Sequence, residues 1–182
     1  MRRSTVALLL GAVVLAGCGK ETEPAPNPVP AGLAPATVLD GDLQLHLNDA
    51  RETTAAFHQD DNLSLISDGK LWEVRRNDRL VGTLEIATLK PSVDVARASV
   101  RQHITSPILV GATSAIRLAG QEVTTVTRSD GVATLVWFGH GLMEIVQVKD
   151  QQVTGPQLAQ AIIEYQQTQP QWSPLPQLYA PQ

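Results

Sequence analysis

The stretch that decides the fold is residues 132–149, Val-Ala-Thr-Leu-Val-Trp-Phe-Gly-His-Gly-Leu-Met-Glu-Ile-Val-Gln-Val-Lys. Two near-continuous apolar runs, 132–138 and 142–149, are separated by Gly139-His140-Gly141, a composition typical of a tight turn. Strands that are buried on both faces have such unbroken apolar runs. We therefore predict two neighbouring antiparallel strands near the centre of a sheet.

On either side of this stretch, apolar and polar residues alternate with a period of two, which is typical of half-buried strands. The alternation predicts further strands at 43–47, 63–65, 72–75, 80–86, 114–119 and 121–128. Asp68-Gly69 is a tight-turn dipeptide and predicts a hairpin between 63–65 and 72–75. Asn77-Asp78 breaks the next run, and Ser129-Asp130-Gly131 marks the turn before 132–138.

Helices are predicted only after groups of strands. One runs from residue 50 to about 57, behind Asn48 or Asp49 as a cap. A second opens at Pro91-Ser92, because Val93, Ala96, Val100 and Ile104 share one helical face, and it stops at Ser106-Pro107. A third starts at Thr154, which has capping-box spacing to Gln157, and ends at Gln169-Pro170. This order predicts an α+β domain, a mainly antiparallel sheet with helices packed on one face.

The N-terminus carries a basic pair (Arg2, Arg3), an apolar run over 6–15 and then Leu15-Ala16-Gly17-Cys18. The pattern resembles the lipobox of bacterial lipoproteins. The resemblance implies that residues 1–17 are a signal peptide, and that Cys18, the single cysteine, carries a diacylglyceryl group with fatty acyl chains such as palmitate. It also implies an extracytoplasmic protein anchored in the cell membrane or the outer membrane. The alternative is an uncleaved N-terminal helix in which Cys18 is an ordinary buried thiol.

Proline content divides the rest of the chain. Residues 18–37 hold the lipidated cysteine and a Pro-rich tether, since closely spaced prolines favour an extended chain. The tract could instead be a ligand for an aromatic groove, although it lacks a repeated spacing. Residues 38–170 then form a single domain, and residues 171–182 form a Pro-rich C-terminal tail.

The net charge of the mature chain limits the classes of partner that we expect. Loss of residues 1–17 leaves 12 basic and 18 acidic residues, a net charge near −6. Nucleic acid would require a concentrated basic patch, so we expect none as a partner. The membrane is expected as a partner through the lipid on Cys18, together with another envelope protein.

Candidate chemistry is sparse. His46, His58, His103 and His140 lie on separate elements and lack metal-ligand spacing. Asp60, Asp61 and Asn62 offer oxygen ligands but lack the twelve-residue calcium-loop pattern. Nucleophile and phosphate-loop motifs are also missing, so the sequence predicts no catalytic residue, no metal and no cofactor.

The bulky apolar residues of the tail, Trp172, Leu175, Leu178 and Tyr179, are candidate partner contacts, or else they dock on the domain's own groove. The sequence therefore predicts a membrane-anchored, non-enzymatic accessory or interaction domain of the cell envelope. The alternative is a carrier of a small apolar or lipid ligand, which would need a contiguous apolar cavity of several hundred Å³.

Overall fold

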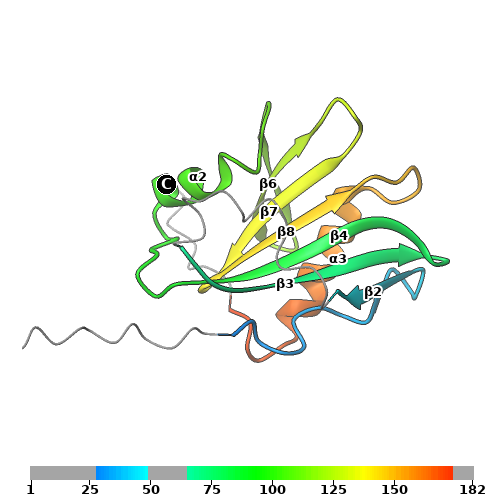
Figure 1. Ribbon diagram of the computed structural model, residues 1–182, viewed down its shortest axis with the longest axis horizontal. Coiled ribbons are helices and arrows are strands. Elements are labelled where there is room, and N and C mark those ends of the chain that lie inside the picture. The colour runs from blue at the N-terminus through cyan, green and yellow to red at the C-terminus, as the bar shows by residue number, and fades with distance from the viewer. Residues whose placement is uncertain (1–27, 49–64, 174–182) are drawn as a thin grey trace, which may run out of the picture.

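An eight-stranded antiparallel sheet forms the body of the protein in the computed structural model, which describes residues 28–48 and 65–173 (Figure 1). The strands follow the order β1-β2-β3-β4-β8-β7-β6-β5 across the sheet. Their bounds are β1 Thr37–Val38, β2 Leu43–Leu47, β3 Ile66–Arg76, β4 Arg79–Leu89, β5 Ser114–Leu118, β6 Gln121–Thr127, β7 Ala133–Gly139 and β8 Leu142–Val148. Two meanders, β1 to β4 and β5 to β8, thus join where β4 pairs with β8.

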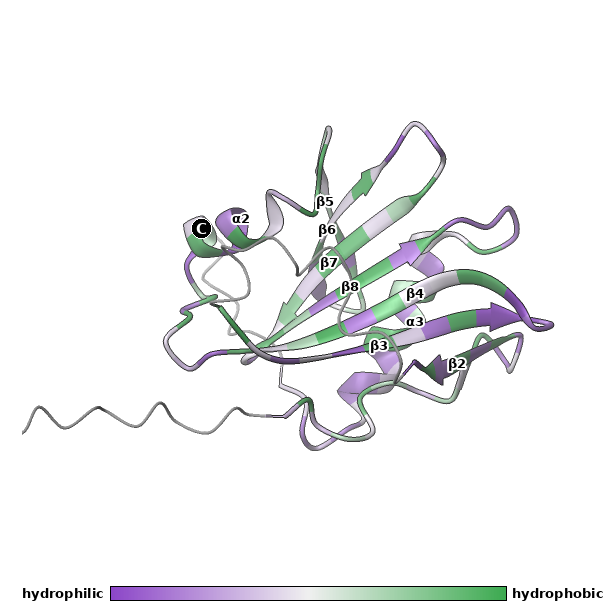
Figure 2. Ribbon diagram, viewed as in Figure 1, coloured by the Kyte–Doolittle hydropathy of each residue, from purple (hydrophilic) through white to green (hydrophobic). Residues whose placement is uncertain are grey.

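The apolar runs of the sequence form the interior strands, as predicted. β8 lies between β4 and β7, and each of these three strands is buried along most of its length. Figure 2 shows the hydrophobic colouring concentrated on them. The α+β class with a dominant antiparallel sheet is therefore confirmed.

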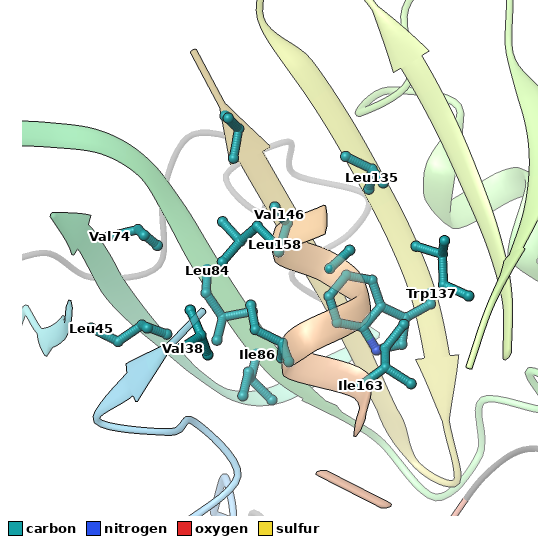
Figure 3. Packing of buried hydrophobic residues seen from close by; sticks show 14 of the residues in the cluster. Val38, Leu45, Val74, Leu84, Ile86, Leu135, Trp137, Val146, Leu158 and Ile163 are labelled. Atoms are coloured by element: carbon teal, nitrogen blue, oxygen red, sulfur yellow. The ribbon is translucent and has the colours of Figure 1, made fainter. Parts of the chain in front are cut away.

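The larger core lies between one face of the sheet and helix α3, Gly155–Gln167. Leu158 and Ile163 of this helix pack on Leu84 and Trp137 of the sheet (Figure 3), and Ile162 belongs to the same core. The predicted capping box is present, because the Thr154 side chain and the Gln157 backbone N–H are bonded, and the Gln157 side chain accepts from the Thr154 N–H. This cap satisfies N–H groups that the first helical turn leaves without partners.

Helix α2, Ala98–Thr105, packs against the opposite face of the sheet, with its Ile104 in a second core that includes Met143 and Phe138. The two helices therefore lie on different faces rather than on the single face that the sequence predicts. Interior strands with apolar residues in both alternating positions need cover on both sides, which accounts for this arrangement. α2 also begins later than predicted, because Arg97 supplies no side-chain cap and Asp94 instead accepts the N–H of Ala96.

The predicted turn at Asp68-Gly69 is wrong. Strand β3 passes through both residues, and the ladder to β4 shifts register between Ile66 and Asp68. A β-bulge uses the same small and turn-forming residues as a hairpin, which explains the misassignment. The hairpin turn lies at Asn77-Asp78, both with positive φ.

The packed part of the chain extends further toward the N-terminus than the predicted boundary at residue 38. Val29 and Leu33, placed by the sequence in the tether, are buried in the larger core, Leu33 completely. Asp68 accepts the backbone N–H of Val29 at 2.6 Å. The predicted helix at 50–57 lies outside the described residues. Among the residues described, no helix has the length and apolar character needed to cross a membrane.

Candidate functional site

A pocket of about 530 Å³ opens at the end of the sheet where β3 turns into β4. It is lined by Arg79, Asp130, Gly131, Lys149, Asp150, Gln151 and Gln152. We call it the loop-end pocket, because its walls are the β3–β4 hairpin, the β6–β7 turn and the loop from β8 to α3. Figure 2 shows hydrophilic colouring on these loops and on the ends of β3 and β8 beside them.

Local turn chemistry shapes two of its walls. In the β6–β7 turn, Gly131 has a φ of +82°, a conformation that glycine adopts without steric cost. Asp130 accepts the N–H of Val132 across this turn at 3.1 Å. In the β8–α3 loop, Asp150 accepts the N–H groups of Gln152 at 2.8 Å and Val153 at 3.0 Å. Each wall is thus held by an aspartate bonded to its own backbone.

Asp150 is the most constrained acid of the pocket. Its side chain is 0 % exposed and bonds Arg76 at 3.2 Å and Arg79 at 2.6 Å. The pKa of Asp150 is lowered from 3.8, first by the N–H of Gln152 and then by the N–H of Val153 and the two guanidinium groups, while burial opposes the shift. The carboxylate is therefore ionised at neutral pH and its charge is balanced.

Arg76 fixes the position of Asp150 and of the neighbouring loops through several side-chain bonds. Its side chain is only 10 % exposed, and it bonds Asp42 at 2.6 Å and the Gln152 side chain at 2.5 Å in addition to Asp150. One guanidinium therefore joins three segments that are distant in the sequence. Such a brace holds the loops in one geometry before any ligand arrives.

Arg79 and Lys149 are the cations that face solvent. The Arg79 side chain is 70 % exposed and uses one terminal nitrogen on Asp150. Lys149 is exposed and forms no ion pair with the residues that the structure describes. The other acid, Asp130, is bonded to Arg128 at 2.9 Å. The pocket consequently offers N–H donors, whereas its carboxylates already have partners.

The loop-end pocket lies at the opposite end of the sheet from both ends of the packed chain. The N-terminal segment meets β3 at Asp68, near the start of that strand, and the pocket begins beyond its last residue, Arg76. Eight residues of extended strand span about 25 Å. The C-terminal segment also ends at the far side, where Ser173 accepts the N–H of His140 in the β7–β8 turn.

A second polar cluster is centred on Glu144 of β8, a carboxylate buried in the larger core under α3. Gln166 of α3 and the indole N–H of Trp172 donate to its two oxygens. Gln166 also donates to the carbonyl of Leu33. Burial raises the pKa of Glu144 from 4.5 to about 7, and the two donors lower it only in part. This cluster fastens both chain ends to the sheet, and it lies in the core rather than in the loop-end pocket.

The residues singled out by sequence are widely spaced. His46 lies on β2, His103 on α2 and His140 in the β7–β8 turn. Within residues 28–48 and 65–173, no three His, Cys, Asp or Glu side chains gather in a way that could hold a metal. Trp172 is buried, 7 % exposed, so its ring is covered by the domain itself. The remaining candidates, Cys18, His58, Asp60, Asp61, Asn62, Leu175, Leu178 and Tyr179, lie outside the described residues.

Sequence reasoning missed the loop-end pocket, because it interpreted Asp130 as a turn residue and the other charges as a solvated surface. The one available signal was Asp150, an aspartate placed between a strand end and a capping box. Compared with protein-family models, with curated proteins and with solved structures, the chain matches none.

Proposed function

We propose that this protein is a lipid-anchored, non-enzymatic interaction domain that presents the loop-end pocket to a partner in the bacterial envelope. The lipobox pattern at Leu15-Ala16-Gly17-Cys18 supports the anchor. The Pro-rich residues that follow support a spacer between the lipid and the domain.

The observation that carries the proposal is the placement of the pocket relative to the chain ends. The tether would reach the domain at Val29, beside Asp68 and the start of β3. The loop-end pocket opens at the other end of the same strand. A domain held at the first end has its pocket turned away from the attachment point, where a partner can reach it.

The state of the charged groups favours binding over catalysis. A general acid or base must exchange a proton near the working pH. Asp150 has a lowered pKa and four hydrogen-bonding or ionic partners, and Asp130 is paired with Arg128. Groups fixed in this way are suited to recognising a ligand, since they are preorganised and keep their charge.

The alternative function, carriage of an apolar ligand, finds less support at this site. Ligand pockets for apolar molecules are lined mainly by hydrophobic and aromatic side chains. The loop-end pocket is lined by charged and amide side chains around one glycine. Its chemistry therefore favours a polar partner.

Crosslinking of the intact lipoprotein in its native envelope tests the proposal. The lysines of the chain are Lys20, Lys70, Lys90 and Lys149, of which only Lys149 lines the pocket. With an amine-reactive reagent and mass spectrometry, we expect links between proteins to form mainly through Lys149. The variant Lys149→Arg keeps the charge and should lose these links. Links that form mainly through Lys70 or Lys90, or no links between proteins, would contradict the proposal.

A further inference from the structure

The cations of the loop-end pocket hold more unused binding capacity than its acids, of which only Asp130 is partly exposed, at 41 %. Asp150 is surrounded by two backbone N–H groups and two guanidinium groups. Asp130 accepts from Val132 and Arg128. Lys149 has no ionic partner among the described residues, and most of the Arg79 guanidinium faces solvent.

The free groups select the sign of the ligand. An ammonium and a guanidinium donate hydrogen bonds and accept none. A ligand that enters must therefore supply acceptor atoms, and a negative charge strengthens these bonds. Cationic ligands would meet Arg79 and Lys149, and the one partly exposed carboxylate, Asp130, is already paired with Arg128.

Charge balance also selects the kind of anion. The lining residues comprise two cations, Arg79 and Lys149, and two acids, Asp130 and Asp150. Arg76 and Arg128 sit against these acids and add two positive charges beside the pocket, while Asp42, which pairs with Arg76, adds one negative charge. Such a modest excess suits a singly charged group better than a phosphate dianion, which the nearby carboxylates would repel. The planar fork of a guanidinium also matches the two oxygens of a carboxylate.

We infer that the loop-end pocket binds a carboxylate group, held by Arg79 and Lys149, on its ligand. The inference rests on the proposed function, since it names the chemistry by which that same pocket recognises a partner. The carboxylate comes from an acidic segment of a peptide or from a free organic acid, because both present the same two oxygens.

NMR titration of the ¹⁵N-labelled mature lipoprotein in detergent micelles tests the inference. The probes are glutarate, a hexaglutamate peptide, the matching hexaglutamine peptide, hexalysine and inorganic phosphate. We expect glutarate and hexaglutamate to shift the amides of Gly131, Lys149 and Gln151. Tighter binding of the peptide points to a peptide partner, and equal binding to a free acid.

Two variants and one control make the test specific. Lys149→Ala should weaken carboxylate binding by about fivefold, the scale of one exposed ion pair, and Lys149→Glu should abolish it. Lys149 supports no ion pair among the described residues, so the fold is expected to survive. The control is Arg97→Ala. Arg97 is about as exposed as Arg79 and also pairs with an aspartate, Asp94, so its removal should leave carboxylate binding unchanged.

Five results would overturn the inference: shifts confined to other surfaces, equal binding of hexaglutamine, binding of hexalysine in the pocket, tighter binding of phosphate in the pocket, or Lys149 variants that bind like wild type. Lys149 crosslinks in the envelope without carboxylate binding would leave the interaction proposal standing and remove this inference. Carboxylate binding without crosslinks in the envelope would support this inference and contradict the interaction proposal.

Discussion

Trp172, five residues beyond the end of α3, donates its indole N–H to the buried carboxylate of Glu144 at 3.3 Å. The contact joins the start of the C-terminal tail to the interior strand β8. Glu144 also receives a bond from Gln166, which in turn holds Leu33 of the N-terminal segment. A single buried acid thus connects both chain ends to the sheet.

This acid makes stability depend on pH. The pKa of Glu144 is raised by burial from 4.5 to about 7, so between these values the folded state binds more protons than the unfolded state. Stability is therefore highest below pH 4.5 with respect to this group, and it falls as the pH rises to about 7. The shift corresponds to a loss of about 3 kcal/mol. The lowered pKa of Asp150 has the opposite effect, because its contribution to stability is lost as the pH falls below the usual range of an aspartate.

Urea unfolding between pH 5 and pH 8 measures this effect. Wild type should lose stability over the range, and Glu144→Gln should flatten the dependence, because the amide does not ionise. Glu122→Gln, at an exposed position of β6, is the control and should keep the slope. A wild-type stability that rises from pH 5 to pH 8 would show that Glu144 does not control this range.

Removal of the Trp172 ring should destabilise the domain strongly. Trp172→Ala opens a cavity and removes one donor from Glu144, at a cost of about 3–5 kcal/mol. Trp172→Phe keeps an aromatic ring and should cost less stability. It should also raise the pKa of Glu144, because the charged carboxylate loses a hydrogen bond, so stability should be lost at a higher pH than in wild type. If Trp172→Ala unfolds at the wild-type urea concentration, the tail does not dock as described.

The N-terminal segment should contribute to stability in the same way. Leu33 is 0 % exposed, so Leu33→Ala should cost about 2–5 kcal/mol in urea unfolding. Val110 is 71 % exposed, and Val110→Ala serves as the control, with a change expected within about 0.5 kcal/mol. If Leu33→Ala and Val110→Ala are equally stable, the segment around Leu33 does not pack in the core and belongs to the tether.

The proposed lipid anchor depends on one atom, the sulfur of Cys18. Cys18→Ser should abolish incorporation of an alkyne fatty acid in growing cells, and it should leave the precursor unprocessed or the domain unanchored. The measurement is gel fluorescence after conjugation of a dye to the alkyne. Equal labelling of the variant and wild type would contradict the assignment of Cys18.

The parts of the fold predictable from sequence are those set by neighbouring residues. Alternation located β2, β4, β5, β6 and the second half of β3, the apolar runs located β7 and β8, and Thr154 with Gln157 located the start of α3. The predicted strand at 63–65 is not confirmed, because residues 63 and 64 lie outside the described residues and Leu65 precedes β3. Asp68-Gly69 misled because a bulge and a turn use the same residues. The unbroken apolar runs imply cover on both faces of the sheet, but which helix covers which face depends on packing between distant segments, which local patterns do not encode.

The site was harder to predict for the same reason. Arg79, Asp130 and Asp150 are far apart in the sequence and converge only through the pairing of β4, β7 and β8. Glu144 stands in an apolar run, and its burial depends on cover from α3 and from Trp172. Trp172 itself was recognised as unusual, although the sequence left open whether it docks on the domain or on a partner.

The most direct test of the interaction proposal is site-specific photo-crosslinking in the native envelope. A photoreactive amino acid replaces Gln151 at the rim of the loop-end pocket or, as the control, Gln160 on the exposed side of α3. We expect Gln151 to yield a discrete adduct that Lys149→Ala diminishes, and Gln160 to yield none. Capture from Gln160 alone, or an adduct at Gln151 that does not change with Lys149→Ala, would contradict the account.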